Sequence, residues 1–433
     1  MENHPTPDDT QRIPTSILTE TACPQSDAAP GPAWDAETVR PRSNARDTLP
    51  AEAAPAEAAP AEAAPVRPRS NARENAPWPK AAFLARAHQA EARLRSWRRD
   101  FGDRYDVFDF AFNFRAGGSR VHIVYDELEI PQDLWFVGDL HGDLLALEAA
   151  LSHIDAHSEL PPTIVFLGDL FDRFDYGLEV VMRVLALVIE RPGKILWIAG
   201  NHDDGLFYDD LNRRFASRVL PAEFVDFLNE HEEYHDFGKW LVGLCQQLPR
   251  ALVLPDGLFV AHGGCPSFDM NTFGYAIDDL HSVEDLERPD ILRTFIWNRV
   301  IPDQDQKSGD EVGKDDLVHF FAGLERLIGF PLKRMLRGHD HCRESRHQYF
   351  DHYAPEAPVL TLATMSAWYL GTDEFPPELM RTLRKQPVTT PAIARYRHGD
   401  LPAVTTLDIP AAVVAQFHPL EELTAPPTQP TAS

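Results

Sequence analysis

Polar side chains that can bind a cation stand at five points where a short apolar run gives way to glycine and polar sequence. The residues are Asp139 and His141 in GDLHGD, Asp169 in GDLFDR, Asn201 in GNHD, His262 in HGG and His339 in RGH. Carboxylate, amide and imidazole donors without thiolate favour a hard-to-borderline divalent ion such as manganese, iron or zinc. Six donors exceed the needs of one tetrahedral ion, and a carboxylate in the middle of the set can bridge two ions. The pattern therefore predicts two neighbouring divalent ions.

A pair of such ions lowers the pKa of a bound water and neutralises charge on a phosphoryl group under in-line attack. The phosphate oxygens also need cationic anchors. Arg173 in GDLFDR and Arg299 in FIWNRV are the candidates, because a guanidinium fork matches the geometry of phosphate. The leaving oxygen must collect a proton, and His202 can supply it if Asp172 holds the imidazole in its protonated form. These residues predict hydrolysis of a phosphate ester.

Each of these elements taken singly also has a structural explanation. A carboxylate at a strand end often caps the following helix, and one histidine is more often a hydrogen-bonded structural residue than a metal ligand. Five such elements at successive element ends of one chain favour the metal interpretation instead.

The elements that must position these side chains alternate between strand and helix. The runs DLWFVGD, TIVFLGD and KILWIAGN predict strands, followed by helices from Leu144, from Leu178 and across 206–247. Such alternation predicts a largely parallel sheet with functional groups at the carboxyl ends of its strands. After Pro249 the runs ALVL, GLFVAHGG, VLTLATMSAWY and ARYRHGDLPAVTTLDI predict a more sheet-rich half, with one further helix near 315–328.

The first 76 residues differ in composition from the rest of the chain. AEAAP occurs three times over 51–65, between two copies of VRPRSNAR at 39–46 and 66–73. A segment so poor in large apolar side chains cannot offset its ordering entropy, so we expect a disordered arm over 1–76. The paired basic octapeptides allow two interpretations, a docking motif for a partner or a simple duplication within a linker.

A catalytic domain is expected over 77–412, with a helical lead-in over 77–125 and a flexible tail over 413–433. Within the lead-in, PKAAFLARAHQAEARLRSWRRDF places Pro at a helix start and apolar residues at helical spacing. The apolar residues are Phe83, Ala87, Ala90, Leu94 and Trp97. We therefore expect an amphipathic helix over 79–101 that caps the folded domain.

The charge of the chain disfavours several classes of partner. Asp and Glu number 67 against 41 Lys and Arg, a net charge of −26, which repels nucleic acid and anionic lipid. The four cysteines are scattered and form no CxxC pair, which favours a reducing compartment. The acidic N-terminus has no secretory pattern, and no apolar run approaches the ~18 residues of a membrane span. We expect a cytoplasmic protein that binds neither membrane nor nucleic acid.

Taken in order, the five motifs resemble those of the phosphoprotein phosphatases, the serine/threonine phosphatase type of calcineurin-like metallophosphoesterase. That family shows GDxHG, GDxxDRG, GNHE, HGG and RxH, and the resemblance runs from about Asp133 to Pro410. It implies an α/β (α+β) fold of four layers, in which a central β-sandwich is flanked by helices. It also implies two divalent metal ions, with manganese expected first and iron or zinc as alternatives.

The resemblance also implies a role for each matching residue. The first ion would be held by Asp139 and His141, the bridge would be Asp169, and the second ion would be held by Asn201, His262 and His339. Arg173, Arg299 and Asn201 would bind the substrate phosphate, with His202 and Asp172 as the acid pair.

Three residues depart from the family pattern. Phe174 stands where the family has the glycine of DRG, so the loop after Arg173 must suit a bulky residue or carry strain. Asp203 replaces the glutamate of GNHE, and GNHD is also what the related diadenosine polyphosphate hydrolases show. Cys265 follows HGG in place of an apolar residue, and we interpret it as a small buried side chain rather than a redox-sensitive thiol.

The sequence thus predicts a dimetal phosphoesterase that hydrolyses phosphoserine and phosphothreonine in proteins by attack of metal-activated hydroxide. One alternative is a hydrolase of diadenosine polyphosphates or other small phosphoesters. An alternative of another class is an inactive metal-binding scaffold whose N-terminal arm recruits a docking partner.

Overall fold

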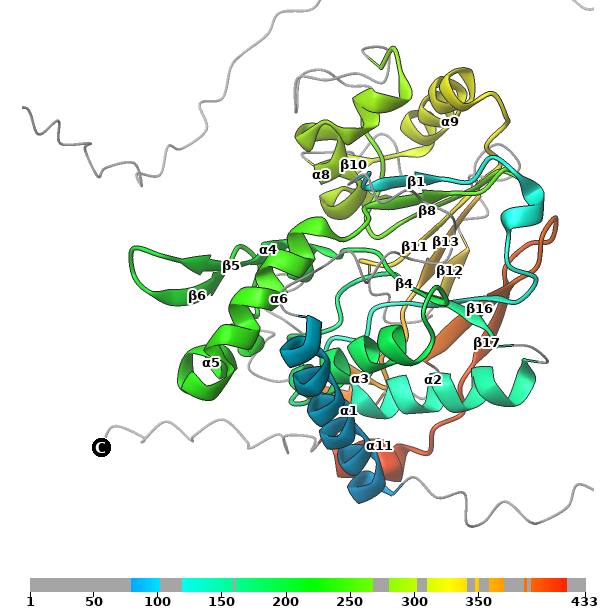
Figure 1. The fold of residues 1–433 in the computed structure, drawn as a ribbon. Helices are drawn as coiled ribbons and strands as arrows, with labels where there is room; N and C mark the ends of the chain where they lie inside the picture. Colours follow the sequence, from blue (N-terminus) through cyan, green and yellow to red (C-terminus); the bar gives the residue numbers. More distant parts are fainter. Residues whose placement is uncertain are drawn as a thin grey trace, which may run out of the picture. The chain divides into compact units, whose positions relative to one another are not determined.

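The computed structural model describes residues 79–101, 119–158, 161–267, 280–301, 310–340, 347–349, 358–369, 385–387 and 391–418. Two sheets stacked face to face lie between helices on either side, as Figure 1 shows. The predicted α/β (α+β) class, with a central β-sandwich flanked by helices, is confirmed. The arm expected over 1–76, with its paired octapeptides, lies outside the described residues.

The first sheet contains the three predicted strands that precede the motifs GDLHGD, GDLFDR and GNHD in the sequence. Its order is β17-β16-β2-β3-β4. The strands are β2 (Leu134–Val137), β3 (Thr163–Phe166), β4 (Ile195–Trp197), β16 (Ala392–Tyr396) and β17 (Ala403–Thr406). β2, β3 and β4 run parallel, and β16 joins β2 in the antiparallel sense. The parallel strands are connected by α2 (Leu144–His157) and α3 (Gly177–Glu190), so their carboxyl ends share one edge.

The second sheet has the order β1-β7-β8-β11-β13-β12. Its strands are β1 (Val121–Ile123), β7 (Ala251–Val253), β8 (Leu258–Ala261), β11 (Arg334–Arg337), β12 (His347–Tyr349) and β13 (Val359–Leu362). Two helices, α8 (Pro289–Trp297) and α9 (Lys314–Ile328), pack their apolar faces on it. β8 and β11 are parallel neighbours, so the ends that carry the HGG and RGH motifs also lie together.

The hydrophobic core between the sheets fixes the position of one sheet on the other. Phe136 and Leu196 from the first sheet share a buried cluster with Val260, Leu336 and Leu362 from the second. Alternate residues of each buried strand face this layer, and the others face the helices. Apolar burial on this scale stabilises by about 25 cal/mol for each Å² removed from water. The packing therefore holds the strand ends of both sheets in one place.

The expected helices over 206–247 are wrong for the first part of that range. β5 (Leu206–Asp209) and β6 (Arg214–Ser217) form an antiparallel hairpin after α4 (Asn201–Gly205). The Asp209 carboxylate accepts hydrogen bonds from the backbone N–H groups of Leu211 and Asn212, at 2.9 and 3.1 Å, and this closes the turn. The helical pattern begins only at α5 (Glu223–Glu230) and continues in α6 (His235–Gln247).

Shorter elements complete the described part. They are the strands β9 (Arg299–Val300), β10 (Glu311–Val312), β14 (Ala367–Tyr369) and β15 (Lys385–Pro387) and the 3-10 helices η2 (Glu127–Glu129), η3 (Glu232–Tyr234) and η5 (Val283–Glu287). None of the helices in the described ranges combines the length and apolar composition needed to cross a membrane.

The expected amphipathic helix is confirmed as α1 (Lys80–Phe101). Its five apolar residues are the buried ones, and the helix packs mainly on α3. A further helix, α11 (Ala411–Phe417), contacts it through the rings of Phe83 and Phe417, whose centroids are 5.7 Å apart. The sequence predicted a flexible tail from residue 413, but α11 occupies the start of that range. The chain is packed through His418, whose side chain is fully buried.

We expect Leu94→Ala to lower the free energy of unfolding by about 2–5 kcal/mol, because it opens a cavity between α1 and α3. Gln89→Ala on the exposed face of the same helix is the control, with an expected change within about 0.5 kcal/mol. Urea unfolding followed by circular dichroism measures both. Equal effects of the two substitutions would show that α1 is not part of the cooperative core.

Candidate metal centre

All six predicted metal-binding residues follow strands directly or within a short turn. Asp139 follows β2, Asp169 follows β3, and Asn201 begins α4 after β4. His262 follows β8 and His339 follows β11, in the second sheet. The backbone N–H of His339 donates to Asp139 Oδ2 at 2.9 Å, so the ends of the two sheets meet. The structure therefore brings together side chains from five strand ends.

The turns that carry these side chains are tight. His141, Asp169 and His339 have positive φ values of 47°, 52° and 73°, a region that costs non-glycine residues free energy and that clusters at functional sites. Glycine is required beside them, because a Cβ on Gly200 would lie 2.1 Å from Asp169 Oδ1 and one on Gly338 would lie 2.1 Å from Asp139 Oδ1. The glycines noted in the sequence thus allow the carboxylates to approach the backbone.

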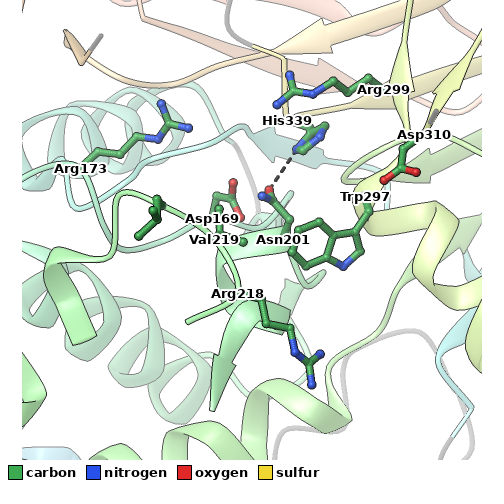
Figure 2. A pocket seen from close by; sticks show the side chains of 10 residues that line it. Asp169, Arg173, Asn201, Arg218, Val219, Trp297, Arg299, Asp310 and His339 are labelled. Carbon is green, nitrogen blue, oxygen red and sulfur yellow. Dashed lines mark hydrogen bonds between the residues drawn. The ribbon is translucent and has the colours of Figure 1, made fainter. Parts of the chain in front are cut away.

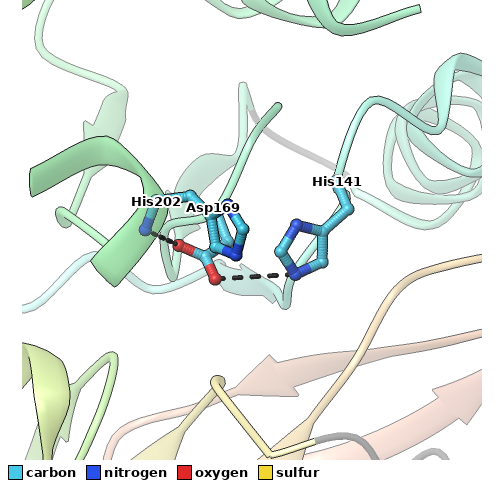
Figure 3. A group of neighbouring side chains, drawn as sticks. All are labelled: His141, Asp169 and His202. Carbon is cyan, nitrogen blue, oxygen red and sulfur yellow. Dashed lines mark hydrogen bonds and ion pairs between the residues drawn. The ribbon is translucent and has the colours of Figure 1, made fainter. Parts of the chain in front are cut away.

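One group of possible ligands consists of His141, Asp169 and His202, shown in Figure 3. Their donor atoms lie within 4.8 Å of one another, and all three side chains are buried. His141 Nε2 lies 3.5 Å from Asp169 Oδ2, while the backbone N–H of His202 donates to Asp169 Oδ1 at 2.9 Å. The sequence assigned His202 to proton transfer, but its position beside Asp169 also suits a ligand.

The second group consists of Asp169, His262 and His339, and the Asn201 amide oxygen lies close to both imidazoles. His262 Nε2 lies 3.4 Å from Asp169 Oδ2 and 3.0 Å from Asn201 Oδ1. His339 Nδ1 lies 3.0 Å from the same amide oxygen and 3.2 Å from His262 Nε2. Asp169 belongs to both groups, which is the position that the sequence predicted for a bridging carboxylate.

The imidazoles of this cluster are oriented as those of metal ligands usually are. His262 Nδ1 donates to the Leu167 carbonyl at 2.8 Å and His141 Nδ1 donates to the Phe171 carbonyl at 3.2 Å, which leaves both Nε2 atoms facing the carboxylates. In the described part of the chain, the buried Nε2 of His202 has no hydrogen-bond partner. A neutral imidazole held through its other nitrogen is the usual arrangement of a metal ligand.

The electrostatics of this cluster reflect its high density of charge. Burial lowers the pKa of His262, but the carboxylates of Asp169 and Asp139 outweigh it and raise that pKa to about 9. Burial, together with Arg299 and His262, keeps the pKa of His339 well below its ordinary value. Burial raises the pKa of Asp169, yet the neighbouring imidazoles bring it well below the usual range. A bound cation would take over the role of the proton on His262.

Asp203, the departure from GNHE, supports the turns around the cluster. Its Oδ2 accepts the backbone N–H groups of Gly200 at 2.7 Å and Asp169 at 2.9 Å, and the indole N–H of Trp197 at 3.3 Å. Burial and the charge of Asp169 raise the pKa of Asp203 to about 6. The shorter side chain thus fastens the Asn201 turn to the Asp169 turn.

Phe174, the second departure, does not carry the strain of its loop. The positive φ values fall on Asp172 and Arg173, at 70° and 69°. The Phe174 N–H donates to the His141 carbonyl at 3.0 Å, and its ring packs on His418 at a centroid distance of 4.6 Å. The loop therefore accommodates a bulky residue and packs it against the end of α11.

Cys265, the third departure from the family pattern, is fully buried in the core of the second sheet, as predicted.

A pocket of about 350 Å³ opens beside the cluster, and Figure 2 shows its lining. Arg173, Asn201 and Arg299, the three residues predicted to bind phosphate, all line it. The Arg299 guanidinium is held by Asp340, with Nη1 2.8 Å from Oδ1. The pocket is also lined by five residues that sequence reasoning did not single out: Arg218, Val219, Leu220, Trp297 and Asp310. Trp297 lies two residues before Arg299 in FIWNRV, whereas the others lie outside every motif and so give no signal in one sequence.

The predicted acid pair is also in contact. His202 Nδ1 lies 2.7 Å from Asp172 Oδ2, with both side chains buried. The other carboxylate oxygen accepts the Phe224 N–H at 3.0 Å. Burial raises the pKa of Asp172, and the hydrogen bond with His202 works against that rise. The carboxylate fixes the orientation of the imidazole.

Comparison with known proteins gives the same family as the motifs. A model of the calcineurin-like phosphoesterases matches residues 133–343, which include all six candidate ligands. The PP2A-like serine/threonine-protein phosphatase PPG1 of Candida albicans is 23% identical over 229 residues, and a catalytic subunit of protein phosphatase 2A from Dictyostelium discoideum is 20% identical over 239 residues. These alignments cover 49% and 52% of this chain, and 48% and 67% of the two relatives. The chain thus spans about half the length of the Candida protein.

Solved structures give weaker likenesses. A Saccharomyces cerevisiae serine/threonine phosphatase with similarity to human PP5 has a TM-score of 0.46 at 16% identity, covering 77% of this chain and 90% of that one. A putative diadenosine tetraphosphatase has a TM-score of 0.34 at 16% identity, covering 66% and 98%. The motifs, the two stacked sheets and the family match agree with one another, and residues 133–343 are similar to the calcineurin-like phosphoesterases.

Proposed function

We propose that this protein is a phosphomonoesterase that depends on two divalent metal ions and removes phosphate from phosphoserine and phosphothreonine in proteins. The observation that carries the proposal is the buried cluster of oxygen and imidazole donors beside a pocket that Arg173 and Arg299 line. The serine/threonine phosphatases among its relatives support this substrate class. We place this enzyme in the cytoplasm, because the scattered cysteines of its sequence favour a reducing compartment.

The proposed metal ligands are the residues predicted from the sequence. They are Asp139, His141 and Asp169 for one ion and Asp169, Asn201, His262 and His339 for the other. Bound divalent ions supply Lewis acidity and lower the pKa of a bound water. The mixed oxygen and nitrogen donors favour manganese, with iron and zinc as alternatives. Backbone groups hydrogen-bond to the side chains of four of these donors, so these need little reorganisation for binding; they are Asp139, His141, Asp169 and His262.

The proposed role of the arginines is to hold the phosphate. Arg299 is kept in place by Asp340, and the loop of Arg173 is fixed where its backbone N–H donates to Glu223 Oε2 at 2.9 Å. Guanidinium groups approaching the phosphate oxygens neutralise charge and set the orientation of the ester for in-line attack. The Asn201 side chain lies at the same pocket and would contact both the phosphate and a metal ion.

The proposed role of His202 is to give a proton to the leaving oxygen of serine or threonine. An alkoxide is a poor leaving group, so this transfer matters more for a phosphorylated side chain than for an aryl phosphate. Asp172 orients the ring through the 2.7 Å contact and stabilises its protonated form.

A panel of substrates tests the proposed function. With manganese present, we expect the highest kcat/KM for a phosphoserine peptide, a lower value for diadenosine tetraphosphate, and measurable turnover of p-nitrophenyl phosphate. Faster hydrolysis of the dinucleotide would support the second candidate, which the Asp of GNHD favours. Inertness towards all three despite bound metal would identify a scaffold.

We expect His202→Asn to lower kcat on a phosphoserine peptide by about 10²–10⁴-fold, because the leaving alkoxide loses its proton donor. The loss should be smaller for p-nitrophenyl phosphate, since nitrophenolate leaves without a proton. Metal content measured by elemental analysis should stay at the wild-type value. Loss of metal from this variant would make His202 a ligand instead. His157→Asn, an exposed histidine on α2, serves as the control.

We expect Asp169→Asn to weaken Mn²⁺ binding by more than about 100-fold. Removing a residue that only hydrogen-bonds to a metal ligand costs roughly 10–100-fold, and Asp169 is itself a proposed ligand. The reason is that Asp169 is shared by both groups of donors. Asp175→Asn, an exposed carboxylate of the same loop, should bind as the wild type does. Calorimetric titration of metal-free protein measures both, and unchanged binding by the Asp169 variant would overturn the shared site.

A further inference from the structure

The pocket contains a third arginine that the proposed mechanism does not use. Arg218 follows β6 directly, is exposed, and lines the pocket with Trp297 and Val219. Its guanidinium lies over the ring of Phe207, 5.7 Å from the centroid. Within the described ranges it forms no ion pair with a carboxylate, whereas Arg299 is paired with Asp340. Arg218 therefore presents a charge that no carboxylate of the described ranges neutralises by direct contact.

The backbone of Arg218 is fixed relative to the metal centre. Its N–H donates to the carbonyl of Gly205 at 3.0 Å, and Gly205 ends the helix α4 that begins with Asn201. The next residue packs closely as well, because a Cβ on Gly205 would lie 3.0 Å from Val219 Cγ2. The strand before it is held in the hairpin with β5. The guanidinium is therefore carried by a segment that is joined to the catalytic turn.

Arg218 faces a different region from the other two arginines. In Figure 2, Arg173 and Arg299 flank the side of Asn201 nearer to His339, and Arg218 lies on the opposite side of Asn201. Its guanidinium points away from the Asp169 carboxylate in that view. It is therefore not placed to hold the same phosphate oxygens.

We propose that Arg218 binds a second anionic group of the substrate, an acidic side chain close to the phosphorylated residue of a peptide. The proposal rests on the function proposed above and names its preferred substrates, phosphopeptides with an acidic flank. The apolar surfaces of Trp297 and Val219 line the same pocket. Such surfaces suit the backbone and methylene groups that separate two charges in a peptide better than a continuous chain of phosphates.

The charge of the whole protein makes such a residue consequential. A net charge of −26 repels an acidic peptide at long range, so local cations must provide the attraction. A guanidinium is weakly hydrated, so it gives up little when it binds a carboxylate or a phosphate. A neutral side chain of the substrate forms no such ion pair, so Arg218 would favour acidic peptides over neutral ones.

Two peptides that differ only by glutamate or glutamine next to phosphoserine test the inference. We expect wild-type protein with bound manganese to favour the glutamate peptide in kcat/KM by about threefold to fivefold, the effect of one exposed ion pair. Arg218→Gln should bring that ratio to about one, and Arg218→Lys should retain most of it. Arg214→Gln removes the same charge from the exposed first residue of β6, the strand that Arg218 follows, and should keep the wild-type ratio. Added salt should reduce the ratio only where Arg218 is present.

Equal kcat/KM for the two peptides with wild-type protein would overturn the inference while leaving the proposed function intact. A preference that persists in Arg218→Gln would also overturn it. A loss confined to diadenosine tetraphosphate would identify the second anion as a phosphate and reject the acidic peptide. No turnover of either peptide would overturn both the inference and the proposed function.

Discussion

The convergence of buried carboxylates and imidazoles at Asp169 is the interaction on which the rest of the structure depends. Each of these groups would be costly to bury alone, because a charge removed from water without a partner loses most of its solvation. Together they compensate one another, as the opposite pKa shifts of Asp169 and His262 show. A bound divalent cation would supply the same compensation in place of the proton on His262.

Two sheets are needed to build that cluster, since neither one carries all of its members. Asp139, Asp169 and Asn201 belong to the first sheet, and His262 and His339 to the second. The apolar layer between the sheets fixes the position of one sheet on the other. At the site, a hydrogen bond from the backbone N–H of His339 to the Asp139 carboxylate joins them. Packing far from this cluster therefore determines the distances between its side chains, because a closely packed core transmits displacement rather than absorbing it.

Much of this arrangement could be predicted from the sequence, because motifs and periodicity are local signals. The candidate ligands follow strands and have glycine neighbours, both of which can be read from the motifs, and the buried face of α1 follows from helical spacing alone. The hairpin at 206–217 was missed because its turn depends on how Asp209 bonds to the backbone, which the apolar pattern does not reveal. Arg218 and Asp310 were missed for a different reason, since only the folded chain brings these isolated residues to the pocket.

The contact between Phe174 and His418 has a consequence for the order in which the molecule is assembled. The loop that carries Arg173 lies early in the domain, whereas its packing partner comes from the last described helix. Contacts between residues so distant in sequence form late, because the intervening chain must be ordered first. During synthesis, β2, β3 and β4 can pair before His418 is available to pack against this loop. The loop would then reach its final packing only when α11 has been made and has docked.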